Sequence, residues 1–235
     1  MAIAEFHEFK TREELAEELA ITVANKLVPD IEIGQFASLA LSGGSTPKLF
    51  LNKLGAMLGE IGEMIYLALV DERFVPSDDP RSNENMVLKE LGFNEHPETE
   101  FLSLFAQNST PEEAATLAQV KLLEDEELPF DVLTLGMGLD GHTASLFPKA
   151  DNLSAATDPS TNKLFQAITA PGADEPRITM TLPVIISAHY LVLHIEGAEK
   201  RAVFDEAMKD GDADALPIRH VLRHKGANLH VYWTP

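Results

Sequence analysis

Short apolar runs alternate along the chain with longer stretches in which apolar and polar residues follow a helical repeat. The longer stretches predict helices at residues 47–59, 83–91, 111–127 and 197–209. The apolar runs are bounded by glycine or polar residues, as buried parallel strands usually are, and they occupy residues 36–41, 65–70, 132–135 and 191–195. This alternation predicts an α/β fold with a mainly parallel, open, Rossmann-like sheet flanked by helices on both faces.

A further helical stretch, residues 11–28, has a clear amphipathic pattern. Thr11 and Glu14 have the spacing of a capping box, which marks the start of a helix. Behind them, leucine and valine recur every four residues, at positions 15, 19, 23 and 27. We therefore expect a surface helix whose apolar stripe faces the core.

The chain shows no internal repeat, no low-complexity tract and no clear linker. A stretch rich in proline and aspartate, residues 148–160, is interpreted as a long surface loop. A chain of 235 residues with 45% hydrophobic residues can bury a substantial core. We predict a single domain that spans residues 1–235.

Composition narrows the possible classes of function. The chain has no cysteine, which excludes disulfide scaffolds, thiolate zinc sites and cysteine nucleophiles. Residues 1–7 lack the basic start and apolar stretch of a signal peptide, and no later run could span a bilayer. These features predict a soluble, cytoplasmic protein, and we expect a monomer.

The formal net charge of −20 affects the choice of partners. Such a charge repels nucleic-acid backbones and anionic membranes, so we expect neither as a partner. If the substrate is an anion, its site has to be a small positive region within this acidic protein, built from a few cationic side chains and backbone amides.

Polar loops follow three of the predicted strands. They begin at Ser42, Asp71 and Gly136. In open α/β sheets, ligands bind beyond the carboxyl ends of the strands. The sequence therefore places a candidate site at this edge of the sheet.

The first loop, Ser42-Gly43-Gly44-Ser45-Thr46-Pro47, joins a predicted strand to a predicted helix. We expect Thr46 to cap that helix and Pro47 to occupy its first position, which leaves free backbone amides facing the loop. Because glycine lets backbone approach a ligand and a helix amino end favours negative charge, the loop is a candidate phosphate site. An ordinary strand-to-helix turn is the alternative. The lysine that ends a Walker loop is missing.

The second loop carries three consecutive charges, Asp71-Glu72-Arg73, directly after an apolar strand. Burying all three would be costly, so at least one should face a cleft. A carboxylate and a guanidinium there could serve acid–base chemistry and hold an anion. Further on, Ser82 or Asn83 could cap the next helix, and Arg81 is either a surface charge or a second anion contact.

The third loop, Gly136-Met137-Gly138-Leu139-Asp140-Gly141, matches the dinucleotide-binding fingerprint. Its context does not, because Pro148 cuts the following helix short and no acidic residue ends a second strand. We therefore interpret it as a glycine-rich turn that presents Asp140 and His142. A histidine in this setting is a candidate proton-transfer group, although a lone histidine is more often structural.

Arg177 and Lys200 are two further cations that could close the site. Arg177 begins the stretch Arg177-Ile178-Thr179, and Lys200 lies at the start of a predicted helix that follows a buried strand. A lysine in the first helical turn opposes the helix dipole, so it is favoured there if an anion binds nearby. Either residue could instead be an ordinary surface charge.

Taken together, these segments resemble the 6-phosphogluconolactonase family, which is similar in fold to the glucosamine-6-phosphate deaminases. The resemblance runs from Ser42 to about Arg201, and its segments arrive in the family's order. They are residues 42–47, 70–76, 81–83, 136–148, 177–179 and 197–200. Each segment alone is modest evidence, whereas the ordered set is highly specific.

The resemblance implies hydrolysis of 6-phospho-D-glucono-1,5-lactone to 6-phosphogluconate in the oxidative pentose-phosphate route. It implies no metal and no organic cofactor. Carried over residue by residue, it implies that the sugar phosphate is held by backbone groups and two cations: Ser42, Gly43, Gly44, Ser45, Thr46, Arg177 and Lys200. A phosphorylated lactone would then be the small-molecule partner.

The resemblance also implies catalytic roles. His142 would act as general base and then as general acid, and Asp71, Arg73 and Asp140 would line the reacting end. The sequence leaves open whether Asp71 or Asp140 orients His142.

One position separates the two branches of this fold. The deaminases carry a glutamate just before the proline, where this chain has Phe147 before Pro148. The resemblance is therefore closer to the lactonases. A deaminase or isomerase of amino-sugar phosphates and a non-catalytic sugar-phosphate-binding protein remain as alternatives, and the chain offers no basic DNA-binding segment that would favour a regulator.

Overall fold

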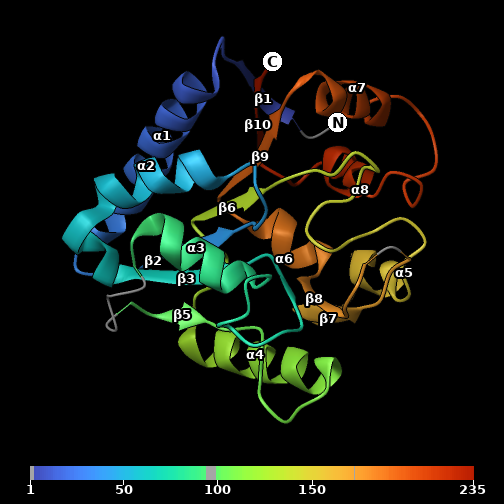
Figure 1. Ribbon diagram of the computed structural model, residues 1–235, viewed down its shortest axis with the longest axis horizontal. Coiled ribbons are helices and arrows are strands. Elements are labelled where there is room, and N and C mark those ends of the chain that lie inside the picture. The colour runs from blue at the N-terminus through green and yellow to red at the C-terminus, as the bar shows by residue number, and fades with distance from the viewer. Residues whose placement is uncertain (1–2, 94–98, 172) are drawn as a thin grey trace.

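A seven-stranded sheet runs through the centre of the computed structural model, which describes residues 3–93, 99–171 and 173–235 (Figure 1). Every neighbouring pair of its strands is parallel. In spatial order the strands are β1 (Ile3–Glu8), β10 (Leu229–Thr234), β9 (Tyr190–Glu196), β6 (Val132–Leu135), β2 (Ala37–Leu41), β3 (Ile65–Leu69) and β5 (Phe101–Leu102). The four predicted strands are the adjacent strands β9, β6, β2 and β3. Their residues are almost all buried, which explains their unbroken apolar runs.

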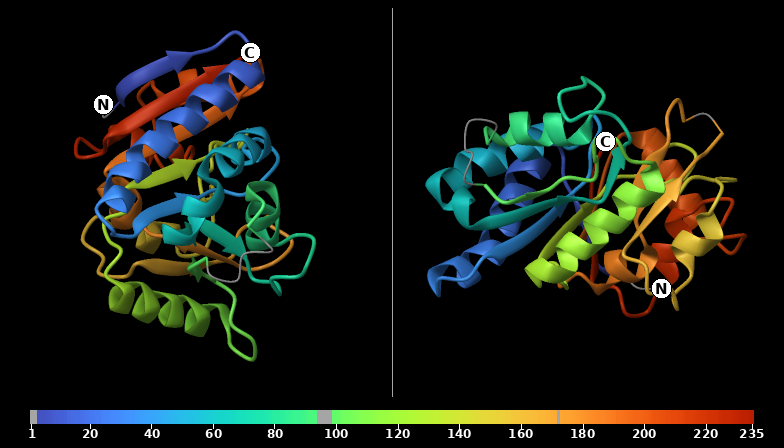
Figure 2. Two further views of the ribbon diagram at one scale, coloured as in Figure 1. Left: turned by 90° about the vertical axis from the view of Figure 1, so that its left-hand side faces the viewer. Right: turned by 90° about the horizontal axis from the view of Figure 1, so that it is seen from below.

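Helices cover both faces of this sheet, which confirms the predicted fold class (Figure 2). Lys26 of the first helix lies over the ring of Tyr190 in β9, whereas Phe204 packs on Phe6 from the opposite face. One layer consists of α1 (Arg12–Glu32), α2 (Lys48–Leu58) and α3 (Asn83–Leu91), and a short 3₁₀ segment, η1 (Gly59–Met64), follows α2. The other layer contains α6 (Leu182–Ser187), α7 (Ala198–Ala207) and α8 (Ile218–Arg223).

The amino-terminal helix α1 follows its predicted pattern. The Thr11 hydroxyl accepts a hydrogen bond from the Glu14 amide at 3.1 Å, and the four predicted core positions on α1 are fully buried. The helix does not stop at residue 28 but continues through Pro29 to Glu32. Ile31 packs against the core and helps to extend the helix past the proline.

A second, smaller sheet was not predicted. It is antiparallel and consists of β4 (Asp71–Arg73), β8 (Arg177–Met180) and β7 (Phe165–Ile168). The prediction that Asp71-Glu72-Arg73 is a loop was therefore wrong, because these residues pair with β8. The helix α4 (Pro111–Asp125) packs against this sheet and is capped by Thr110 and Glu113.

Residues 148–160 are also more ordered than predicted. They contain the short helix α5 (Leu153–Thr157), which forms because Leu153 and Ala156 lie one turn apart and both bury their side chains. The surface-loop prediction is therefore wrong for residues 153–157, whereas the rest of the segment is turn or coil at the surface. Among the residues that the structure describes, no helix combines the length and apolar character needed to cross a membrane.

Candidate active site

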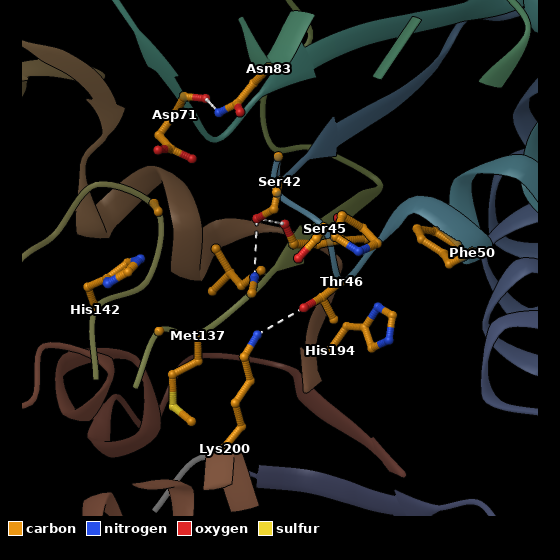
Figure 3. Close-up of a pocket in the computed structure, with 18 of the residues that line it drawn as sticks. Ser42, Ser45, Thr46, Phe50, Asp71, Asn83, Met137, His142, His194 and Lys200 are labelled. Atoms are coloured by element: carbon orange, nitrogen blue, oxygen red, sulfur yellow. Dashed lines mark hydrogen bonds between the residues drawn. The ribbon is translucent and has the colours of Figure 1, made fainter. Parts of the chain in front are cut away.

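A pocket of about 260 Å³ opens at the carboxyl ends of β2, β6 and β9, where the small sheet meets the large one. The predicted site residues that line it come from all three loops and from the two later cations. They are Ser42, Gly43, Gly44, Ser45, Thr46, Asp71, Arg73, His142, Arg177 and Lys200. Figure 3 shows His142 on one side of this pocket and Thr46, Lys200 and His194 on the other.

Ser42 anchors the first loop to the neighbouring strand. Its hydroxyl donates to the Thr134 carbonyl at 2.9 Å and accepts from the Gly136 amide at 3.2 Å. Gly43 has no room for a side chain, since a Cβ there would lie 2.0 Å from the Asn83 Oδ1 atom. Gly44 adopts a φ of +96°, which favours glycine. The two glycines therefore hold the loop in a shape that larger residues would disrupt.

Thr46 does not cap the helix that follows it. Helix α2 begins at Lys48, and Pro47 before it makes no side-chain cap. The Thr46 hydroxyl instead accepts a hydrogen bond from the Lys200 ammonium at 2.9 Å. The prediction that Thr46 caps the helix is therefore wrong. Its hydrogen bond instead joins the first loop to Lys200, which is far from Thr46 in the sequence.

Lys200 lies in the first turn of α7, where its ammonium faces the pocket. Burial lowers the pKa of Lys200, and the neighbouring Glu196 carboxylate partly opposes that shift. A bound anion would stabilise the charged form of this amine.

His194 is a pocket residue that the sequence did not single out. It is 3% exposed, its Nε2 lies 3.0 Å from Glu196 Oε1, and its Nδ1 has no hydrogen-bond partner. Arg12 also pairs with Glu196, so this carboxylate joins α1 to the base of the pocket. His194 lies within a run of buried apolar residues in β9, so the sequence there resembles an ordinary core strand and gives no sign of a site.

His142 forms a pair with Asp140 on the glycine-rich turn. Its Nδ1 lies 2.6 Å from Asp140 Oδ1, and its backbone amide donates to the same oxygen at 3.1 Å. Burial raises the pKa of Asp140, but pairing with His142 has the larger combined effect and holds that pKa below its ordinary value. An ionised Asp140 favours a proton on Nδ1 and leaves Nε2 as the basic nitrogen. Of the two carboxylates considered, the structure thus pairs Asp140 with the imidazole.

Gly138 makes room for this pair. A Cβ at residue 138 would lie 2.2 Å from His142 Cε1 and 2.7 Å from Asp140 Oδ1. The turn is closed by a hydrogen bond of 2.9 Å from the Gly138 amide to the His142 carbonyl. The chain continues as turns up to residue 152, so no helix follows the turn directly and the dinucleotide-binding context is absent here.

Phe147 packs directly against the His142 ring, with the ring centroids 4.4 Å apart. The Arg177 guanidinium lies 5.6 Å from the centre of the same phenyl ring. An apolar ring therefore occupies the position at which the deaminases carry a carboxylate.

Asp71 lies on the first position of β4 and is bound to a different partner. The Ser145 hydroxyl donates to Asp71 Oδ2 at 2.5 Å, and the Asn83 side-chain amide donates to the Asp71 carbonyl at 2.9 Å. Asp71 is 7% exposed and faces the pocket. Ser145 thus holds this carboxylate in place, and Asn83 holds the Asp71 main chain.

Glu72, between two pocket residues, points away from the pocket. Its carboxylate accepts hydrogen bonds from the Ser82 hydroxyl and from the backbone amides of Arg73, Asn83 and Glu84, at 2.7–2.9 Å. Ser82 is also the N-cap of α3, as one of the two predicted alternatives had it. The buried Glu72 carboxylate therefore offsets the partial positive charge at the amino end of α3.

Arg73 and Arg177 lie side by side on the adjacent strands β4 and β8, because they are direct partners in the register. The Nε atoms of both are buried without a hydrogen-bond partner. Burial lowers the pKa of Arg177, an effect that Asp71 opposes and Arg73 reinforces. Two like charges in direct opposition are unfavourable unless an anion lies between them or nearby.

Of the predicted site residues, Asp140 does not line the pocket although it pairs with His142, and Arg81 lies away from both. Its guanidinium pairs with Asp79 at 2.9 Å and with Glu175 at 3.4 Å on the surface. Its backbone carbonyl accepts a hydrogen bond from Arg73. Arg81 can therefore orient Arg73 through its main chain, whereas its own charge is already paired.

Comparison with known proteins gives a consistent result. Residues 10–233 match a family model described as glucosamine-6-phosphate isomerases/6-phosphogluconolactonase. The chain is 41% identical to a protein of Rhizobium meliloti named 6-phosphogluconolactonase, over 99% of both chains. It is also 41% identical to a protein of the same name from Mesorhizobium japonicum, over 97% of this chain and 94% of that one.

Among solved structures, the chain resembles a 6-phosphogluconolactonase from Shewanella baltica with a TM-score of 0.90 and 34% identity. The match covers all of this chain and 98% of the other. The similarity therefore extends over the sheet, both helical layers and the pocket.

Proposed function

The chain belongs to the family of glucosamine-6-phosphate isomerases and 6-phosphogluconolactonases, and we propose that it hydrolyses 6-phospho-D-glucono-1,5-lactone to 6-phosphogluconate in the oxidative pentose-phosphate pathway. The observation that carries this assignment is full-length identity of 41% with proteins named 6-phosphogluconolactonase. Phe147, packed on His142 where a deaminase has its glutamate, supports the lactonase branch.

At the end of the pocket where the lactone would react, His142 would serve as the general base. With Nδ1 bound to Asp140, His142 can accept a proton on Nε2 from a water molecule as that water attacks the lactone carbonyl carbon. The tetrahedral intermediate then breaks the bond between the carbonyl carbon and the ring oxygen, which takes the proton back from His142. Arg73 and nearby amides would stabilise the oxyanion.

The opposite end of the pocket has the features of a phosphate site. The Ser42–Thr46 backbone and Lys200 would hold the phosphate there and so fix the orientation of the lactone. Arg177, which lies 5.6 Å from the Phe147 ring and beside Arg73, would add its charge from the His142 side of the pocket. Lys200 is buried and bonded to Thr46, and Arg177 has an unpartnered buried Nε. Both observations support a role for these cations in binding an anion.

Further details of this assignment are also proposals. We propose that the chain forms one domain, acts in the cytoplasm as a monomer and needs no metal or organic cofactor for hydrolysis.

The purified protein is expected to accelerate hydrolysis of 6-phosphogluconolactone, measured as proton release above the spontaneous rate. Gluconolactone without phosphate should be hydrolysed with a much lower kcat/KM, because it cannot use the phosphate site. Glucosamine 6-phosphate serves as the control for the related activity and should release no ammonia. Ammonia release, or no acceleration of lactone hydrolysis, would contradict the assignment.

Lys200→Met is expected to raise the KM for the phosphorylated lactone about 10- to 100-fold, which corresponds to loss of one charge-assisted hydrogen bond. Initial rates over a range of lactone concentrations measure this effect. Hydrolysis of gluconolactone is the matched control, and it should not change, because it lacks the phosphate. An equal loss with both substrates would mean that Lys200 does not bind the phosphate.

The lowered pKa of Lys200 gives this contact a pH dependence. The amine binds anions only when protonated, so the contact is complete below its pKa and is lost as pH rises through it. Because the pKa of Lys200 is lowered, the KM should begin to rise at a lower pH than it would if Lys200 had the pKa of an exposed lysine. In Lys200→Arg, whose guanidinium stays protonated, the rise should be absent over the same range.

A further inference from the structure

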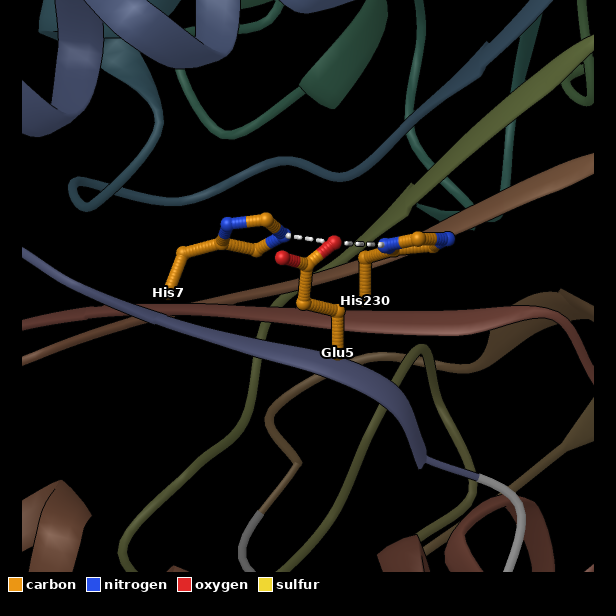
Figure 4. Close-up of side chains that lie close together, drawn as sticks. All are labelled: Glu5, His7 and His230. Carbon is orange, nitrogen blue, oxygen red and sulfur yellow. Dashed lines mark ion pairs between the residues drawn. The ribbon is translucent and has the colours of Figure 1, made fainter.

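Glu5, His7 and His230 form a cluster at the edge of the large sheet, away from the pocket (Figure 4). Glu5 and His7 are two residues apart on β1 and therefore point to the same face. His230 lies on β10, where it is the register partner of Glu5. None of the three residues lines the pocket described above.

The hydrogen bonding of this cluster is incomplete. Glu5 Oε2 lies 3.6 Å from His7 Nε2 and 3.9 Å from His230 Nδ1, both beyond hydrogen-bond distance. Both ring nitrogens are buried and have no hydrogen-bond partner. Figure 4 shows the carboxylate between the two rings, with His7 Nε2 and His230 Nδ1 directed at it in two long ion pairs. Buried nitrogens without a hydrogen-bond partner are uncommon, and an ordered water or a bound ion is what usually satisfies them.

Aromatic neighbours fix the orientation of both imidazoles. The His7 ring stacks on Tyr232 with centroids 4.4 Å apart, and the His230 ring stacks on Tyr190 at 4.2 Å. The two tyrosines are themselves joined by a hydrogen bond of 2.8 Å between their hydroxyls. The two nitrogens are therefore held in position before any ligand binds.

We propose that Glu5, His7 and His230 bind one divalent transition-metal ion, of which Zn²⁺ is the best match. The three ligand atoms lie within 4.8 Å of one another. A tetrahedral zinc site with bonds of about 2.0–2.1 Å holds its ligands about 3.3 Å apart, so small side-chain shifts would complete the site. Two imidazoles with one carboxylate suit zinc better than magnesium or calcium, which prefer all-oxygen sites. Glu5 is 63% exposed, which gives the ion a path of entry.

The site would act on the structure of the protein and not on the reaction. A metal bound here joins the edge strand β1 to β10 through side chains, in addition to their backbone hydrogen bonds. Since metal binds only the folded arrangement, it should stabilise the paired state of these strands.

The test uses purified protein without a polyhistidine tag, stripped of metal with a chelator and titrated with Zn²⁺ in a calorimeter. We expect one Zn²⁺ per chain and a higher melting temperature when it is bound. Glu5→Gln, at an exposed position, and His7→Gln should each weaken binding by about 10- to 100-fold or more, as loss of even an outer-shell partner does. His220→Asn is the matched control, because His220 pairs with Asp214 alone at 2.8 Å, and it should bind Zn²⁺ like the unmodified protein.

A measurement on the unmodified protein does not depend on the folding of any variant. On addition of Zn²⁺, the imidazole NMR signals of His7 and His230 should shift, whereas those of His220 should not. The proposal is overturned if the protein binds no Zn²⁺, if the signals of His7 and His230 do not respond, or if folded Glu5→Gln protein binds Zn²⁺ as tightly as the original.

Discussion

Replacing His142 with alanine lowers kcat for hydrolysis of 6-phosphogluconolactone by about 10²- to 10⁴-fold, the usual contribution of a general acid–base group. The expectation follows from the pair with Asp140, which directs the basic nitrogen of the imidazole away from the carboxylate. The KM should change little, since Thr46 and Lys200 hold the other side of the pocket. Steady-state kinetics, corrected for spontaneous hydrolysis, measure both constants.

A second histidine–aspartate pair offers the control for this experiment. His220 Nε2 lies 2.8 Å from Asp214 Oδ1 on the surface, and neither residue lines the pocket. His220→Ala removes an equally paired imidazole and should leave kcat within about twofold, as surface substitutions usually do. Unchanged kcat in His142→Ala would show that this imidazole is not the base.

Adding one methyl group at Gly138 lowers kcat by about 10²-fold, because it displaces the His142 ring. The new Cβ would lie 2.2 Å from His142 Cε1, so the imidazole has to leave its place beside Asp140. Gly138 is not among the glycines with positive φ, so alanine fits the backbone itself. We therefore expect Gly138→Ala protein to fold normally and to lose activity, as measured by its thermal midpoint and by kcat.

Gly136 in the same turn provides a matched substitution. A Cβ there would meet no atom within 4 Å. Gly136→Ala should therefore lower kcat less than tenfold and keep the His142–Asp140 pair intact. If the two alanine variants lost activity equally, crowding of His142 would not be the cause.

The elements that the sequence predicted best are those whose pattern is local. The strand at residues 132–135 and the helix at residues 83–91 have the predicted bounds. The strand is a buried apolar run, and the helix is delimited by Ser82 as its cap and Gly92 as its left-handed end. Such signals lie within a few residues of the element that they define.

The elements that were missed depend on distant partners. Asp71-Glu72-Arg73 has no apolar pattern and becomes a strand because Arg177–Met180 lies beside it. The edge strand β1 has no buried residue, and its neighbour β10 mixes buried with partly exposed residues. Both strands include a histidine, so they lack the continuous apolar run of the central strands. Long-range pairing of this kind leaves little trace in the local sequence.

The candidate site shows the same division. Loop glycines, His142 and Lys200 could be predicted to lie in one pocket, because parallel strands end at one edge of the sheet. The hydrogen bond between Lys200 and Thr46 could not, since a threonine before a proline is also a plausible helix cap. Arg81 could not be separated from Arg73 either, because its neutralising partners include Glu175, which is distant in the sequence.

The pairing of β1 with β10 has a consequence for synthesis on the ribosome. Within the described sheet, the first strand to be made has the last strand as its neighbour. Residues 3–8 therefore leave the exit tunnel early and remain without their native partner until residues 229–234 follow. Central strands have partners that are made sooner, whereas residues 3–8 stay unpaired until residues 229–234 have been made, so nascent chains would expose an unpaired strand to chaperones during that interval.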